Sequence, residues 1–232
     1  MSLGIMQPYL LPYIGYFQLI AAVDRFVIYD NVEYTKKGWI NRNRMLVNQK
    51  ASTFTIPIKK ASDKSLISER EVSNDFNSEK LLNKIHGAYS KAPYFSDTYS
   101  LLQKILAYES ENLFDFLAYS LNQTLSHLDM STTLIASSSL PVDRTLKGER
   151  KVMAICKAVG EREYINPVGG AHLYNKAHFQ REGLDLKFIR PLPIKYCQFD
   201  DLFEPSLSIL DVMMFNAVTQ VREMVLENYE LV

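Results

Sequence analysis

Apolar and polar positions near the N-terminus follow a pattern typical of short strands around one helix. Residues 2–6 and 26–29 are apolar runs, whereas residues 15–23 place apolar side chains at helical spacing. A strand, a helix and a second strand in this order form a βαβ unit, in which the two strands lie parallel. Residues 42–47 and 53–58, separated by a short polar turn, predict a β-hairpin.

The middle of the chain has a different pattern, with apolar residues at helical spacing and polar residues between them. This predicts a helical insertion at about residues 76–129. Farther along, short apolar runs again alternate with helical segments, which continues the α/β order. We expect strands at 132–136, 163–165 and 186–189, and helices at 78–89, 96–108, 112–128, 146–159, 173–180, 208–216 and 219–227.

These elements predict one α/β domain over residues 1–232, with a mainly parallel sheet and the helical insertion. Lys plus Arg equals Asp plus Glu, at 26 each, so no net charge attracts nucleic acid or an anionic membrane. Cys156 and Cys197 lie far apart, which is typical of a reducing compartment. Neither a signal peptide nor an apolar run of the roughly 20 residues that a membrane span needs is apparent, so we expect a cytoplasmic protein.

The loop QPYLLPYIGYF at 7–17 follows the first predicted strand. In open parallel sheets, ligands bind beyond the carboxyl ends of the strands. Gly15 permits close approach, and free amides at the helix N-terminus suit a phosphate or a carboxylate. The alternative is a connector whose tyrosines pack in the core. The candidate binding residues of this loop are Gln7, Tyr9, Tyr13, Gly15 and Tyr16.

A second loop, DNVEYTKKGWINRNR at 30–44, mixes both charges with the single tryptophan. Trp39 can stack on a base, a sugar face or an acyl group, and arginine offers a planar fork for carboxylate or phosphate. The alternative is a solvated charged loop in which Trp39 serves as a packing anchor. The candidates are Asp30 and Arg42 for catalysis, and Glu33, Lys37, Trp39, Asn41 and Arg44 for binding.

A third loop, INPVGGAHLY at 165–174, carries a glycine pair that permits tight backbone geometry. His172 is predicted at the start of a helix, where the helix dipole disfavours its charged form and leaves a neutral base. The alternative is that His172 only caps or packs. The four histidines of the chain do not cluster, so no metal site is expected. The candidates are His172 for catalysis, and Asn166, Gly169 and Gly170 for binding.

Three further charged residues stand out. Lys147 and Arg150 lie at the head of a predicted helix, where they can bind phosphate, although charged first turns are common. Asp211 lies inside an apolar helical pattern, where we expect an arginine or a backbone group as its partner.

Four motifs span nearly the whole chain: MQPYLLPYIGYFQLI, VIYDNVEYTKKGWINRNR, YINPVGGAHLY and FEPSLSILDVMMFN. In content and order they resemble the WbqC-like protein family. The resemblance implies a role in the synthesis of O-antigen and other surface polysaccharides. It also implies a transferase that moves an amino acid such as glycine, or a related acyl group, onto a nucleotide-linked amino sugar. The implied co-substrates are a nucleotide-sugar and an acyl or aminoacyl donor.

The first two motifs are also similar in layout to nucleotidylyl transferases of the HUP type. These have a strand, an HxGH-type turn at a helix start, a second strand and a lysine-rich loop. Here Tyr13 and Tyr16 stand in place of the two histidines, and a phenol with a pKa of about 10 supplies no cation. The likeness therefore implies a Rossmann-like fold with a phosphate or nucleotide pocket, and it puts nucleotidylyl transfer in doubt.

Three functions remain open at this point. They are the aminoacyl or acyl transferase, a nucleotidylyl transferase with an altered turn, and a non-enzymatic binding protein within a biosynthetic complex. An exposed apolar patch would favour the last of these. For an active site, we expect the three loops to converge in one polar hollow at one edge of the sheet.

Overall fold

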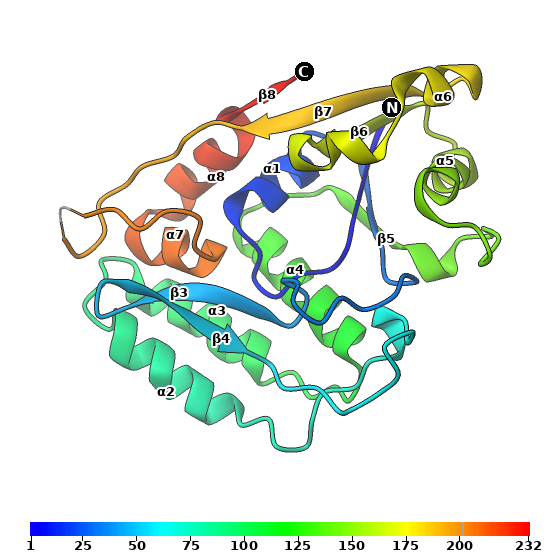
Figure 1. Cartoon of the computed structure of the whole chain (residues 1–232). Coiled ribbons are helices and arrows are strands. Elements are labelled where there is room, and N and C mark those ends of the chain that lie inside the picture. The colour runs from blue at the N-terminus through cyan, green and yellow to red at the C-terminus, as the bar shows by residue number, and fades with distance from the viewer. Residues whose placement is uncertain (201) are drawn as a thin grey trace.

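The computed structural model describes residues 1–200 and 202–232. Its centre is a six-stranded sheet in the order β5-β2-β1-β6-β7-β8 (Figure 1). The first five strands in this order run parallel, and β8 is antiparallel to β7. The predicted mixed α/β fold with a mainly parallel sheet is confirmed. The strands are β1 (Ser2–Met6), β2 (Arg25–Ile28), β5 (Thr133–Ala136), β6 (Glu163–Pro167), β7 (Asp185–Pro191) and β8 (Tyr229–Leu231).

Helices cover both faces of this sheet. One core holds Phe26 and Ile28 of β2, and a second core holds Val27 between them. Because side chains alternate along a strand, the two cores lie on opposite faces. The first core includes residues of α1, α7 and α8, and the second includes residues of α5 and α6 (Figure 1). These helices are α1 (Ile14–Ala21), α5 (Gly148–Val159), α6 (Lys176–Arg181), α7 (Ile209–Phe215) and α8 (Val218–Glu227).

The predicted hairpin is present as β3 (Arg42–Val47) and β4 (Lys50–Thr55), but its second strand begins earlier than the sequence indicated. Asn48 and Gln49 have φ angles of 48° and 62°. Two successive residues with positive φ form the tight turn whose twist matches a hairpin. The turn therefore has two residues, and pairing resumes at Lys50 instead of at residue 53.

The predicted insertion folds as three helices between β4 and β5. Residues from all three helices belong to the same apolar core as α1 and α8, so the insertion packs on that face of the sheet. The side chains of Asn77 and Asn112 accept hydrogen bonds from the first-turn amides of two of these helices, which fixes where they begin. The helices are α2 (Ser78–Tyr89), α3 (Phe95–Leu106) and α4 (Leu113–His127).

The segment after β6 differs from its prediction. A 3-10 helix covers Val168–Leu173, and α6 begins only at Lys176, where the Asn175 side chain caps it. The predicted helix at 173–180 is therefore wrong at its start. His172 lies in the last turn of the 3-10 helix and not at the start of an α-helix, so the helix dipole argument for a neutral imidazole does not apply to it.

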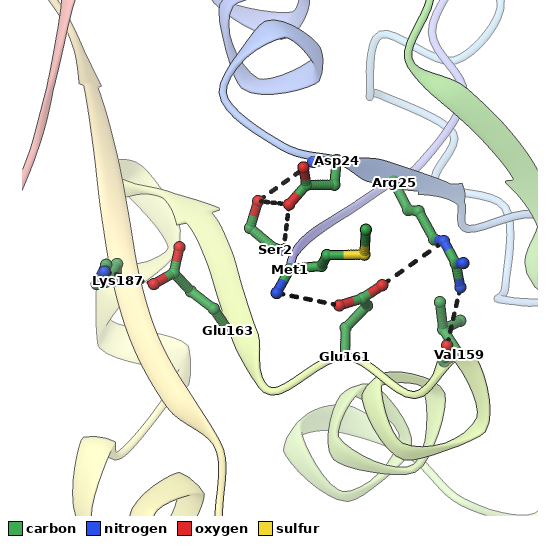
Figure 2. A network of polar contacts seen from close by, with 8 residues as sticks. All are labelled: Met1, Ser2, Asp24, Arg25, Val159, Glu161, Glu163 and Lys187. Atoms are coloured by element: carbon green, nitrogen blue, oxygen red, sulfur yellow. Dashed lines mark hydrogen bonds and ion pairs between the residues drawn. The ribbon is translucent and has the colours of Figure 1, made fainter.

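The amino ends of the strands are joined by paired polar groups (Figure 2). The buried carboxylate of Glu161 lies 3.6 Å from Arg25 Nε and 3.7 Å from the Met1 amino group. Asp24 Oδ2 accepts hydrogen bonds from the Ser2 amide at 2.7 Å and from its hydroxyl at 3.0 Å. These contacts tie the starts of β1, β2 and β6 to one another at the edge opposite the candidate loops.

Candidate functional site

A pocket of about 330 Å³ opens beyond the carboxyl ends of β1, β6 and β7. Met6, Pro167 and Pro191, the last residues of these strands, all line it. The chain moves from β1 outward through β2 to β5, and then crosses back to place β6 on the other side of β1. This reversal of direction is the position at which open parallel sheets bind ligands.

Three tyrosines of the first loop line the pocket, and they differ in availability. Tyr16 is buried, and its hydroxyl donates to the Gln7 carbonyl oxygen at 2.9 Å, so it packs in the core as the connector alternative suggested. Tyr9 is half-buried, and Tyr13 is exposed. Burial raises the pKa of all three phenols, which therefore stay protonated and can donate hydrogen bonds.

Gly15 also lines the pocket, but its surroundings are already filled. A Cβ atom at this position would lie 2.7 Å from the Tyr13 ring and 3.0 Å from Pro191. Any side chain would therefore push Tyr13 away from the helix. The close approach predicted for Gly15 is made by the protein itself, and glycine here sets the position of the Tyr13 ring.

The second loop and β3 supply the opposite wall. The guanidinium carbons of Arg42 and Arg44 each lie 5.7 Å from the centre of the Trp39 ring, whose side chain is 42% exposed. Arg44 Nη2 donates to the Ser206 carbonyl oxygen at 2.9 Å, while its buried Nε has no hydrogen-bond partner in the part of the chain that the structure describes. Arg42 is instead held by the carbonyl oxygens of Gly38 and Lys37 and does not line the pocket.

Two asparagines of this region hold the backbone. Asn41 is buried, accepts from the Tyr34 hydroxyl at 2.7 Å and donates to the Ile56 carbonyl oxygen at 2.7 Å. Asn43, which sequence reasoning missed, lines the pocket and donates to the carbonyl oxygens of Leu10 and Leu11 at 3.0 and 2.8 Å. Side chains alternate between the two faces of a strand, so Asn43 lies on the same face of β3 as the apolar Met45. Both are buried, whereas Arg42 and Arg44 on the other face are half-buried, and this spacing could have identified Asn43.

The third loop contributes little to the pocket. Asn166 is buried and accepts from the Tyr164 hydroxyl at 2.9 Å, and a Cβ atom at Gly170 would lie 2.6 Å from the Asn166 amide. Gly169 and His172 are exposed. Of this loop, only Pro167 is among the described lining residues. The predicted convergence therefore holds for two loops and not for the third. The expected polar character is wrong, because most of the lining side chains are aromatic or apolar.

A separate polar group lies beside α5, on the opposite face of the sheet. Asp30 is fully buried, and its Oδ1 accepts from the Ser137 hydroxyl at 2.8 Å and from the Ser138 amide at 2.9 Å. Lys151 Nζ donates to the Asn31 carbonyl oxygen at 2.6 Å, and burial lowers the pKa of this lysine. Sequence reasoning missed Lys151 and Ser137, since neither belongs to a distinctive motif.

The remaining candidates are surface residues. Glu33 and Lys147 form an exposed ion pair at 3.9 Å, and Lys37 and Arg150 are exposed.

The prediction of an arginine or backbone partner for Asp211 is wrong. Its carboxylate is buried and accepts hydrogen bonds from three neutral groups, which are the hydroxyls of Tyr89 and Tyr196 and the amide of Gln198.

The chemistry available in the pocket follows from its lining. Aromatic rings offer faces for stacking, Arg44 offers a cation with an unused donor, and Tyr9 and Tyr13 offer hydroxyl donors. Carboxylates and imidazoles do not occur among the lining residues that the structure describes. Within residues 1–200 and 202–232, no group of three or more acidic, cysteine or histidine side chains is placed to hold a metal ion. No helix in these ranges has both the length and the apolar character to span a membrane.

The chain is an α/β protein with an aromatic, arginine-bearing pocket at the carboxyl ends of the strands of a mainly parallel sheet. The chain belongs to the WbqC-like protein family, which matches residues 7–223. It is also similar to the Uncharacterized protein Rv1507c of Mycobacterium tuberculosis, with 28% identity over 223 residues that cover 93% of each chain. No solved structure matches the chain.

Proposed function

We propose that this protein is a transferase of surface polysaccharide synthesis, and that its pocket binds a phosphate-linked amino sugar that receives an aminoacyl or acyl group. The observation that carries the proposal is the arrangement of Arg44 against Trp39 at the pocket. Arg44 has a buried Nε with no partner among the described residues, and the Trp39 ring is partly exposed beside it.

This pair suits a sugar joined to a phosphate. An indole ring stacks on the apolar face of a sugar or on a base, and a guanidinium binds phosphate oxygens through two parallel hydrogen bonds. Arg44 is half-buried and lines the pocket, so an anion bound there would be stabilised by its positive charge. The hydroxyls of Tyr9 and Tyr13 supply further donors to sugar oxygens.

The proposed transfer forms an amide bond between the sugar nitrogen and the donor carbonyl carbon, while the bond from that carbon to the carrier breaks. The sugar amine must lose a proton, and a negative charge develops on the carbonyl oxygen. We assign the stabilisation of that charge to Arg44, because its side chain lines the pocket. The assignment of Asp30 or His172 as the base stays a prediction, and neither residue lines the pocket. The proton of the sugar amine would therefore be accepted by the departing carrier or by water.

We further propose a single Rossmann-like domain of the HUP type over residues 1–232, which acts in the cytoplasm and can join a biosynthetic complex. The order β5-β2-β1-β6-β7 supports this assignment, because it places two parallel units on either side of β1. The shared apolar core of the insertion and α1 supports a single domain.

The single tryptophan allows a direct binding test. Trp39 fluorescence should change in a saturable way when UDP-glucosamine is added, and UDP alone or glucosamine alone should bind more weakly. Arg44→Leu should reduce affinity by about 10- to 100-fold, since a hydrogen bond to a charged group contributes about 1.5–3 kcal/mol. Arg181→Leu, at an exposed arginine of α6, is the matched control and should leave the titration unchanged. Equal binding by Arg44→Leu and the parent chain would contradict the proposal.

A non-enzymatic binding protein is the second candidate, and the lack of carboxylate and imidazole groups among the described lining residues favours it. Mass spectrometry of UDP-glucosamine incubated with acyl and aminoacyl donors separates the two. Amide product that depends on Arg44 supports the transferase, whereas saturable binding without product supports the binding protein.

For nucleotidylyl transfer, calorimetry with nucleoside triphosphates and magnesium is the test. Tyr16, whose hydroxyl is already bonded to Gln7, argues against it.

A further inference from the structure

A second cavity of about 350 Å³ adjoins the pocket and shares Tyr13 and Ser206 with it. We call this cavity the slot. It lies between the start of α1 and the segment that leads from β7 to α7. Apolar side chains form most of its wall, and those that matter here are Ile14, Ile194, Phe203, Leu207 and Val212.

The wall of the slot is held in place by a buried carboxylate. Tyr196 lines the slot, and its hydroxyl donates to Asp211 Oδ2 at 2.6 Å. Gln198 donates to the same oxygen at 2.7 Å, and Tyr89 of α2 donates to Oδ1 at 2.6 Å. At the other end, the Ser208 hydroxyl donates to the Leu11 carbonyl oxygen at 2.6 Å. The segment is thereby anchored to α7, to α2 and to the first loop, so the slot exists before any ligand arrives.

We propose that the slot receives the apolar acyl chain of the donor, so that the transferred group is an acyl chain of several carbons and not glycyl. This inference rests on the proposed function, which supplies the amino sugar that accepts the acyl chain. The shared wall at Tyr13 and Ser206 places the end of the slot next to the pocket, where the acyl carbonyl would meet the sugar amine.

The lining decides between an acyl chain and a charged glycyl group. A free ammonium group held against Ile14, Ile194 and Val212 would lose its hydration without an acidic partner among the described lining residues. An alkyl chain gains from the same contacts. Lys195, exposed at the slot, adds a positive charge that suits an anionic carrier or a carboxylate head group.

Calorimetry with sodium butyrate, hexanoate and octanoate tests this inference on the intact protein. Affinity should rise by about fourfold for each added methylene until the slot is full, which corresponds to about 0.8 kcal/mol per methylene. Ile194→Ala enlarges the slot at a half-buried position and should move the optimum to a longer chain. Val212→Phe should move it to a shorter chain. Leu226→Ala, at an exposed leucine of α8, is the control and should change nothing.

Affinity that does not depend on chain length, or an optimum that Ile194→Ala does not move, would overturn the inference even if Val212→Phe fails to fold. Octanoate should bind with UDP-glucosamine already in place, and competition between the two would also overturn it. If the affinities of the fatty acids follow the expected series while UDP-glucosamine gives no Trp39 signal, acyl-chain binding in the slot is supported and the proposed function is contradicted. If UDP-glucosamine binds and the affinity of the fatty acids does not change with chain length, the proposed function is supported and acyl-chain binding in the slot is contradicted.

Discussion

Polar groups at the amino ends of the central strands, called here the amino edge, differ in their partners from those at the carboxyl ends, called the carboxyl edge. At the amino edge, Glu161, Arg25 and Asp24 are paired with one another or with neighbouring groups (Figure 2). At the carboxyl edge, Arg44 keeps a buried Nε without a partner in the described chain, and Trp39 exposes part of its ring. Hydrogen bonds that are satisfied internally contribute to stability, whereas the Arg44 and Trp39 side chains line a cavity in which they can contact a ligand. The contrast separates residues that hold the fold from residues that can bind.

A buried carboxylate, Glu161, lies at the amino edge, and a second one, Asp211, holds the wall of the slot beside the pocket. Their hydrogen-bonding and ionic partners differ. Glu161 faces a guanidinium and an amino group that are themselves largely solvated, with side chains 42% and 70% exposed. Asp211 faces three neutral donors inside the protein. Loss of Glu161 therefore returns its partners to water, while loss of Asp211 leaves buried donors without an acceptor. The following predictions test this contrast.

The largest effect is expected for Asp211→Ala. The buried Tyr89 hydroxyl, the buried Gln198 amide and the half-buried Tyr196 hydroxyl lose their acceptor. At about 1 kcal/mol for each hydrogen bond, the free energy of unfolding should fall by about 3 kcal/mol. Urea denaturation measures this loss. Burial raises the pKa of Asp211 above 3.8, so the folded protein should lose stability as pH rises from 3.8 through the raised value. Asp211→Asn should lack that slope, and a slope that persists would contradict the assignment.

Removal of the stacking surface by Trp39→Leu comes next. The affinity for UDP-glucosamine should fall by about two- to tenfold, since stacking contributes about 0.5–1.5 kcal/mol. The free energy of unfolding should change little because the ring is partly exposed. Calorimetry measures the affinity, because the variant has no tryptophan signal. A large loss of stability with unchanged affinity would mean that Trp39 is a packing anchor.

A smaller effect is expected for Glu161→Gln at the amino edge. The ion pairs with Arg25 and with the Met1 amino group disappear, and the free energy of unfolding should fall by about 1 kcal/mol because both partners can be solvated. Binding of UDP-glucosamine should not change. Any loss of affinity here would remove the proposed division between the two edges.

The smallest effect is expected for Asp24→Asn, at about 0.3 kcal/mol after solvent screening. The hydrogen bond from the Ser2 amide lowers the pKa of Asp24 below 3.8. The stabilising contribution is therefore present above 3.8 and is lost as pH falls through the lowered value. Thermal unfolding of both chains across acidic pH measures it, and a difference that grows at low pH would have the wrong sign.

Local patterns were sufficient wherever an element buries one regular face. The βαβ start and the three insertion helices follow from spacing alone. The three-residue strand β8 was missed, because its pairing with β7 depends on a distant partner and not on its own composition. His172 was placed at a helix start because the Asn175 cap was not recognised, and α6 begins after that cap.

The amino-acid sequence by itself determined the α/β class, the family and two of the loops that meet at the pocket, since these depend on local patterns and on nearby strand ends. The tertiary structure decided that the third loop contributes only Pro167, that Tyr16 and Asn41 are internal, and that Asn43, Ser206 and Pro191 complete the wall. It also decided that Asp211 is held by hydroxyls and an amide. These outcomes depend on which face of the sheet each segment covers, and that is set by packing between residues far apart in the chain.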